Sequence, residues 1–320
     1  MNKMAKTRKL LLFLANVFFC PATRPGLLLL ACVLAFVGCG VKNEVKIVVS
    51  PKILAARNAD FNELLAIVNQ YEKISDLKST GMKVTLTSGK WESGRQDTYR
   101  TAPGHILFKQ PSLLHLVIHN PMGIIRTTIF QTVSAGDEFS AWGHGSDKVY
   151  LGRNSARGEL VSDDWPGGIP LRPKHVYDAV IPAGIDPTEP GLRISIEESA
   201  DKTAKYYILS VYKEGAPPLI HTVRRIWIER SQLAISRMQS FDDAGRLVGD
   251  INYSEMTLVG GVYLPLKMDI DRPEDGYSLT LEFANGSWGI NSGLDEGSFV
   301  QPQREWMETV ELREKTDGNL

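Results

Sequence analysis

Strand-like alternation of apolar and polar residues fills much of this chain. In YSLTLEF, residues 277–283, apolar side chains occupy every second position, and Ser278, Thr280 and Glu282 lie between them. The same period of two recurs in MKVTLTS, LRISI and YLPLKMDI. This period places successive side chains on opposite faces of a strand. Because each strand then has one polar face, the pattern predicts antiparallel sheet and excludes the parallel core of an α/β protein.

The number of these segments predicts a curled sheet. About a dozen of them follow one another, and an open sheet of that size curls or closes. Residues 58–74, NADFNELLAIVNQYEKI, carry apolar side chains at helical spacing over about four turns. RPKHVYDAV, residues 172–180, is shorter and has Pro173 suited to a first helical turn. We predict a mainly β (α+β) fold, in which a large antiparallel sheet forms a half-open β-barrel covered by a long N-terminal helix and a short lid helix.

A half-open barrel of this size leaves a cavity when the inward side chains do not fill it. The apolar faces of the strands supply the candidate cavity lining, namely Val84, Leu86, Ile194, Ile196, Leu264, Leu266, Met268, Leu279, Leu281 and Phe283. In the loop DDWPGGIPLRP, the side chains of Trp165, Ile169 and Leu171 are unusually apolar for a loop. This loop is either a lid or membrane-contacting loop, or a segment that folds back on the barrel.

The N-terminal region carries an export signal. The run from Leu27 to Gly38 is apolar and follows basic residues, but it is shorter than the ~20 residues that a membrane-spanning helix needs. Its last four residues, FVGC, resemble the lipobox of bacterial lipoproteins. The resemblance implies cleavage before Cys39 and attachment of a lipid to that residue. The alternative is an ordinary signal peptide or a short anchor helix that ends at a cysteine by chance.

Composition excludes several classes of function. The three cysteines end at Cys39, so the rest of the chain has no disulfide, thiolate metal site or cysteine nucleophile. The net charge is -1, and no block of Lys and Arg suggests a nucleic-acid partner. His115 and His119 would lie about 13 Å apart along one strand, too far to share a metal. We find no motif for a hydrolytic or phosphate site, and expect no enzyme, metal or cofactor.

Two stretches resemble a known family. GHILFKQP, residues 104–111, and NSGLDEGSFVQP, residues 291–302, resemble motifs of the LolA/LolB family and its LppX-type relatives, which are periplasmic carriers with a half-closed β-barrel under a helical lid. The similarity extends over roughly residues 55 to 305. It implies binding of lipid or of lipoprotein acyl chains, without a reaction.

Together these features predict the organisation of the chain. The predicted parts are a signal peptide with a lipobox (1–38), a lipidated tether (39–53), a half-barrel domain (54–305) and a polar tail (306–320). We expect a lipid-anchored envelope protein that faces the periplasm and serves lipoprotein or lipid trafficking to the outer membrane, with a periplasmic carrier as a further partner. In some bacteria, an Asp directly after the lipidated cysteine is associated with retention in the inner membrane. This chain has Gly40 at that position, which favours the outer membrane. The alternative is a non-transporting lipoprotein that docks a protein partner on the same scaffold.

Overall fold

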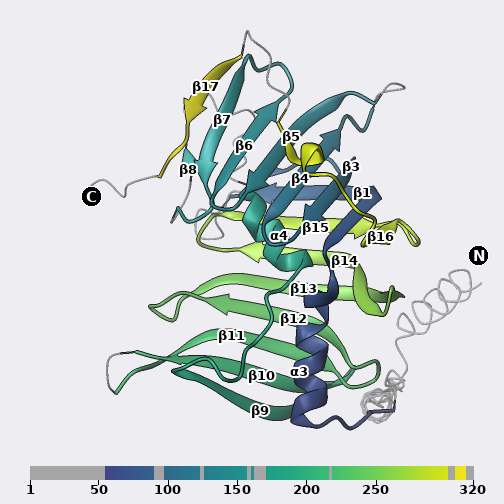
Figure 1. Ribbon diagram of the computed structural model, residues 1–320, viewed down its shortest axis with the longest axis vertical. Coiled ribbons are helices and arrows are strands. Elements are labelled where there is room, and N and C mark those ends of the chain that lie inside the picture. The colour runs from purple at the N-terminus through teal and green to yellow at the C-terminus, as the bar shows by residue number, and fades with distance from the viewer. Residues whose placement is uncertain are drawn as a thin grey trace, which may run out of the picture. The chain divides into compact units, whose positions relative to one another are not determined.

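The structure is a computed structural model of the 320-residue chain (Figure 1). It describes residues 55–89, 97–122, 126–156, 160–161, 171–215, 218–301 and 307–314. All of these belong to one of two units of the chain, Pro51–Leu320. In the part of the chain that is described, no helix is both long enough and apolar enough to cross a membrane.

Strands make up most of the described residues. Those of the first half are β1 (Asp76–Ser88), β2 (Asp97–Thr98), β3 (Ala102–Lys109), β4 (Leu113–His119), β5 (Thr128–Ala135), β6 (Glu138–Gly143), β7 (Lys148–Arg153) and β8 (Leu160–Val161). Those of the second half are β9 (Leu192–Ala200), β10 (Lys205–Glu214), β11 (Ile220–Glu229), β12 (Ala234–Phe241), β13 (Leu247–Val259), β14 (Val262–Arg272), β15 (Tyr277–Phe283), β16 (Trp288–Ile290), β17 (Glu308–Glu311) and β18 (Arg313–Glu314). The helical elements are α3 (Phe61–Asn69), α4 (Pro173–Val180) and the 3₁₀ turns η1 (Gln70–Lys73) and η4 (Glu296–Phe299).

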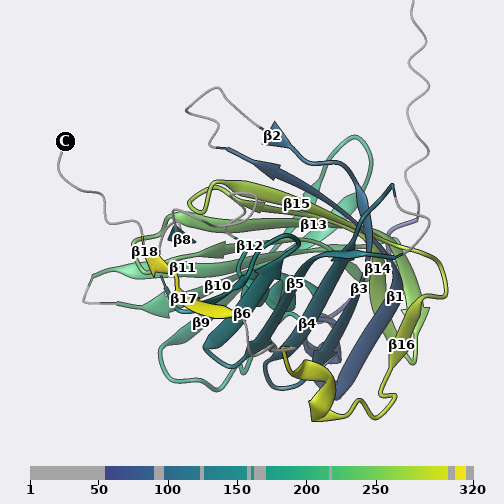
Figure 2. The ribbon, with the colours of Figure 1, turned by 90° about the horizontal axis from the view of Figure 1, so that it is seen from above.

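Sixteen of the described strands form one sheet. Its order is β17-β7-β6-β5-β4-β3-β1-β15-β14-β13-β12-β11-β10-β9, with β2 and β16 paired to β1, while β8 and β18 form a separate pair. The sheet is curled and not closed, since β17 and β9 stand at its two ends. Viewed from above in Figure 2, β3–β6 run at a steep angle to β11–β15. The predicted half-open, curled sheet is therefore confirmed.

One pairing departs from the antiparallel prediction. β17 lies parallel to β7, with Thr309 opposite Val149, whereas the other pairings of the described strands are antiparallel. The expected polar tail after residue 305 therefore contributes strands, β17 and β18. Its sequence, ETVE over the length of β17, has too few apolar residues to indicate a strand.

The strand β1 joins the two halves of the sheet. It pairs with β3 on one side and with β15 on the other. In the second pairing Val84 lies opposite Leu281 and Leu86 lies opposite Leu279. Paired residues of adjacent strands point to the same face of a sheet, so these four side chains form one apolar patch on the inner face.

The long N-terminal helix is a correction to the prediction. The α-helix α3 has nine residues, with Asp60 and Glu63 forming a capping box at its start, and the 3₁₀ turn η1 replaces its expected second half. Tyr71 in that turn is buried and donates a hydrogen bond to the carbonyl of Tyr263. Ile74 is already extended, and β1 begins two residues later. The chain therefore leaves the helix early because Tyr71 and the start of β1 are held by the sheet.

The short lid helix is found where it was predicted. α4 has Pro173 at its first position, and Val176, Ala179 and Val180 on it are buried. It packs against β4, β5 and β14, while α3 packs against β12 (Figure 1). The hydroxyl of Tyr253 donates to the carbonyl of Ala179 at 2.8 Å, so α4 is bound to the second half of the sheet as well. Side chains of α3, α4 and the strands thus fill most of the concave face with one apolar core.

Candidate functional site

An apolar pocket of about 390 Å³ remains where the core is incomplete. It lies among the ends of the strands β1, β3, β4, β5, β6 and β15, away from the edge strands β9 and β17. Val84 and Leu86 of β1 and Leu279 of β15 line its wall, and Leu171, which precedes α4, also lines it. Its volume falls within the ~300–1,000 Å³ range of small-molecule sites. These residues come together because of the β1 to β15 register, which no short sequence pattern reveals.

The predicted cavity residues take different places. Val84, Leu86 and Leu279 line this pocket. Leu264, Met268 and Leu281 are fully buried in the core, and Phe283 packs against Trp288 with ring centroids 4.1 Å apart. Ile194 and Leu266 are half-buried at the margin of the core.

Ile196 departs from the expectation. It is 40% exposed and belongs to β9, the last strand of the described sheet. Most residues of β9 are exposed on both faces of the strand, so little packs over Ile196. Ile196 therefore does not belong to the candidate pocket.

Several predicted residues lie outside the described residues. These are Cys39, Trp165 and Ile169, together with the signal peptide, the lipobox and the whole of the predicted tether. Of the apolar loop expected to form a lid or a membrane contact, Leu171 is described, and it is only 2% exposed. Leu171 thus packs on the barrel, which is the behaviour expected of a segment that folds back.

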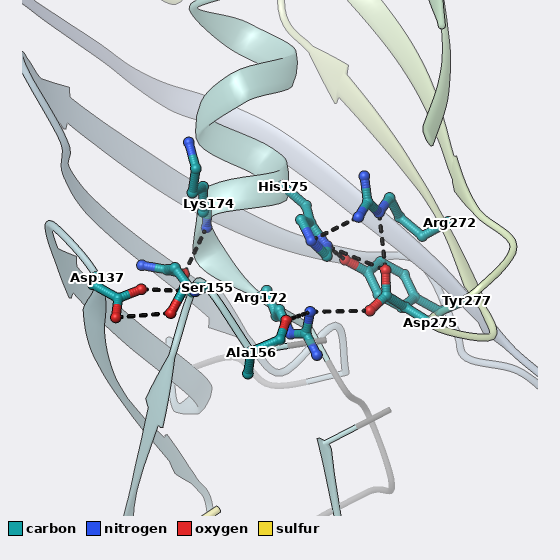
Figure 3. Close-up of polar contacts among 10 residues, drawn as sticks. Asp137, Ser155, Ala156, Arg172, Lys174, His175, Arg272, Asp275 and Tyr277 are labelled. Atoms are coloured by element: carbon teal, nitrogen blue, oxygen red, sulfur yellow. Dashed lines mark hydrogen bonds and ion pairs between the residues drawn. The ribbon is translucent and has the colours of Figure 1, made fainter. Parts of the chain in front are cut away.

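A buried polar network beside Leu171 fixes its position (Figure 3). Nη1 of Arg172 lies 3.4 Å from Oδ1 of Asp275 and donates to the carbonyl of Ala156. Arg172 and Asp275 are each 4% exposed. The Nε of Arg272 donates to Oδ2 of Asp275 at 3.0 Å. Two guanidinium groups therefore share one buried carboxylate, and they connect the start of α4 to the turn between β14 and β15.

His175 of α4 completes this network in its neutral form. Arg272 donates to Nε2 of His175 at 2.9 Å, so that nitrogen carries no proton, and Nδ1 donates to the hydroxyl of Tyr277 at 2.6 Å. Burial, together with the charges of Arg272, Arg172 and Lys174, lowers the pKa of His175 well below its ordinary value. Oδ2 of Asp275 lies 3.8 Å from Nδ1 of His175, and its negative charge favours the protonated imidazole. This carboxylate is, however, already paired with Arg172 and Arg272.

A second polar cluster lies on the opposite, outer face of the sheet. Nδ1 of His105 is 3.3 Å from Nε2 of His119, and the rings of His105 and His115 are 6.2 Å apart. Nδ1 of His115 donates to the carbonyl of Ser298 at 2.6 Å. Burial, and then the charges of His119, His115 and Arg126, lower the pKa of His105 to about 4. Among the described residues, no group of three or more metal-binding side chains could hold an ion.

Sequence reasoning missed His105 as a member of this cluster. His115 and His119 are indeed separated along one strand, but the pairing of β3 with β4 places His105 opposite Val117, between them. Diagonal neighbours on adjacent strands are within reach of large side chains. The signal was available only once β3 and β4 were recognised as a hairpin with this register.

Comparison with known proteins gives similarity of structure alone. No family model and no curated protein matches the chain. Similar solved structures include a DUF1329 family protein from Desulfovibrio piger, with 14% identity, a TM-score of 0.49, and coverage of 74% of this chain and 95% of that one. A LolA superfamily protein from Nitrosomonas europaea has 11% identity and a TM-score of 0.43, over 76% of this chain and 99% of that one.

A third similar structure is a domain described as an outer membrane lipoprotein-sorting protein domain, from Vibrio parahaemolyticus. It has 11% identity and a TM-score of 0.46, over 73% of this chain and 95% of that one. The class that the sequence resembles is thus among the structures similar to this chain. Because identities are this low, we infer function from the chain's own residues.

Proposed function

We propose that this protein is a lipid-anchored protein of the cell envelope that holds one acyl chain, from a lipid or a lipoprotein, in the pocket beside Leu171. The observation that carries this proposal is the apolar wall of the pocket. Val84, Leu86 and Leu279 are apolar, and they line the space that the core leaves unfilled. An unfilled pocket with an apolar wall favours an apolar ligand.

The volume of the pocket sets the size of the ligand. At about 30 Å³ for each water-sized group, the pocket of about 390 Å³ holds roughly a dozen such groups. Methylene groups are of similar size, so the space suits one acyl chain and is too small for a complete two-chain phospholipid. Burial at ~0.8 kcal/mol per methylene is opposed by the cost of ordering a flexible chain. Because the ordering cost offsets part of the gain from burial, we expect the acyl chain to bind reversibly, which suits a protein that passes its ligand on.

The proposed anchor gives this pocket access to a membrane. Under this proposal residues 1–38 are removed, the tether 39–53 carries lipid on Cys39, and the domain from residue 54 onward faces the periplasm. A single acyl chain holds a protein only marginally at a membrane, whereas two or three hold it firmly. The protein would then exchange its ligand with the outer membrane or with a periplasmic carrier. No catalytic step is needed for this role.

The proposal is tested by photo-crosslinking with the full chain in phosphatidylcholine nanodiscs. A C16 acyl probe carrying a diazirine is irradiated, and the labelled peptides are mapped by mass spectrometry. We expect adducts on residues 82–88 and 277–283. Ile118→Trp, which places a larger side chain in the pocket lining, should reduce this labelling about tenfold, equivalent to ~1.4 kcal/mol.

The matched control is Ile67→Trp, because Ile67 is also half-buried against the core but lies on α3, outside the pocket. This variant should be labelled like the original protein. Labelling spread evenly over the surface, and unchanged in Ile118→Trp, would contradict the proposal. The alternative, a lipoprotein that docks a protein partner on the same scaffold, would then account better for the fold.

A further inference from the structure

Arg100 supplies a fixed positive charge at the rim of the pocket. Among the twelve lining residues that the structure describes, the wall is apolar except near Arg100 and His144, with Tyr99 beside them, and none is a carboxylate. An amphiphile that places its chain against Val84 and Leu279 would therefore present its head to a guanidinium group and an imidazole. This arrangement favours an anionic head over a cationic one.

Arg100 has no carboxylate partner among the residues that the structure describes. Its Nη1 lies 3.1 Å from the sulfur of Met122, which is itself 76% exposed. A thioether is a weak hydrogen-bond acceptor, so most donors of this guanidinium have no strong partner in the described part of the chain. A guanidinium group binds a carboxylate or a phosphate through two parallel hydrogen bonds.

The backbone around Arg100 is held against the apolar wall. The amide of Tyr99 donates to the carbonyl of Leu86 at 2.9 Å. On the other side of Arg100, the hydroxyls of Thr101 and Thr85 are 2.7 Å apart. Both contacts join this segment to β1, the strand that supplies Val84 and Leu86 to the pocket. The backbone that carries Arg100 is thus fixed relative to the apolar wall, which lowers part of the ordering cost of binding a ligand that contacts both.

We propose that the ligand of this pocket is a single-chain amphiphile with an anionic head, either a carboxylate or a phosphate. The inference rests on the proposed function, since it names the class of ligand for the same site. The acyl chain lies between Val84, Leu279 and Leu171, and the head is bound by Arg100. His144, on the same rim, is exposed and has its ring 6.4 Å from that of Trp142 in an edge-on arrangement, where it can donate a further hydrogen bond.

The test compares three probes that share one C16 diazirine chain and differ only in the head: a fatty acid, a lysophosphatidate and a fatty alcohol. The full chain in phosphatidylcholine nanodiscs is irradiated with each at pH 7.5, and adducts on residues 82–88 and 277–283 are counted. We expect one or both anionic probes to label these residues about tenfold more than the alcohol. This ratio is equivalent to a difference of ~1.4 kcal/mol in the free energy of binding. Which of the two does so separates a carboxylate from a phosphate ligand.

Variants then assign the preference to Arg100. Arg100→Gln should bring labelling by the anionic probes down to the level of the alcohol, and Arg100→Lys should keep part of the preference because it keeps the charge. Arg126→Gln is the control, because Arg126 is an exposed arginine that lines a neighbouring pocket on the outer face instead of this one. It should leave the preference unchanged.

The outcomes separate this inference from the proposed function. Equal labelling of the pocket by all three probes, unaffected by Arg100→Gln, would overturn the anionic head while leaving an acyl-binding pocket. Labelling of the pocket by none of them would overturn the proposed function, and this inference with it. A preference that survives Arg100→Gln but is lost in Arg126→Gln would also overturn the assignment.

Discussion

Arg172 and Asp275 form an ion pair of 3.4 Å in which each side chain is only 4% exposed. Arg172 lies directly before α4, and Asp275 lies in the turn between β14 and β15. Removing two charges from water costs free energy that their attraction and hydrogen bonds must offset, so a buried pair adds little net stability. Its effect here is positional: it fixes the residue next to it, Leu171, at the wall of the pocket.

Breaking this pair should be costly. Asp275→Asn removes the carboxylate that Arg172 and Arg272 share, and we expect the free energy of unfolding to fall by about 3–5 kcal/mol. Chemical denaturation followed by tryptophan fluorescence measures this. Asp178→Asn is the matched control, because Asp178 pairs with Lys174 on the surface, where the side chains are 45% and 52% exposed. Equal losses in the two variants would contradict the buried role.

The neutral state of His175 predicts a pH dependence with a definite sign. Its pKa in the folded protein lies well below the ordinary 6.5, so the unfolded chain binds a proton more readily. The stabilising effect of the neutral ring is complete above pH 6.5 and is lost as the pH falls below it, at about 1.4 kcal/mol per pH unit. His115 and His119, whose pKa values are also lowered by burial, contribute in the same direction.

His175→Gln isolates the part of this dependence that belongs to the network. Unfolding curves for this variant and the original protein are compared between pH 7.5 and pH 5. The variant should be less stable at pH 7.5, and its stability should fall less steeply on acidification. Parallel curves below pH 6.5 would show that His175 is not held neutral.

The core around Leu281 is predicted to be filled, in contrast to the pocket beside Leu279. Leu281 is fully buried, with Val84 opposite it on β1 and Met268 opposite it on β14. Leu281→Ala should reduce the free energy of unfolding by about 2–5 kcal/mol, through lost burial and the cavity left behind. Leu258→Ala is the control, since Leu258 is 60% exposed and should change stability by less than about 0.5 kcal/mol. A small effect of Leu281→Ala would indicate that the empty space extends into the middle of the barrel.

Lipidation at Cys39 is tested by mass and processing. Cys39→Ala should leave the chain uncleaved and without lipid, so that its mass corresponds to the full precursor. Cys32→Ala, seven residues earlier in the same apolar run, should be processed and lipidated normally. If the mass and membrane association of Cys39→Ala match those of the original protein, the anchor is not at this residue.

The sequence predicted those parts of the fold that depend on local periodicity. Alternation at Leu279 and Leu281 identified β15 and its buried face, and Pro173 marked the start of α4. The end of α3 could not be predicted in this way, because the helical spacing continues through Tyr71. The helix stops where the hydrogen bond of Tyr71 to Tyr263 and the start of β1 take over, and both depend on residues distant in sequence.

The candidate site was only partly predictable for the same reason. Val84, Leu86 and Leu279 were expected to face the cavity because they alternate with polar residues, but the alternation does not tell which inward residues meet space and which meet other side chains. Arg100 gave no signal, since an exposed arginine in a loop is ordinary until a pocket is found beside it. Arg172 and Asp275 lie in separate segments, and only the assembled sheet brings them together.

The position of β1 at the centre of the sheet has a consequence for the synthesis of the protein. Val84 pairs with Leu281, so nearly two hundred further residues must be made before the second edge of β1 finds its partner. At about 5–20 residues per second, this takes roughly 10–40 s. During that time the first half of the sheet exposes an unpaired edge and an apolar face, which are the features that promote aggregation.

The chain therefore depends on being kept apart from its copies until β15 has been made. Mutations that slow the pairing of β1 with β15 should lower the yield of folded protein more than they lower its final stability.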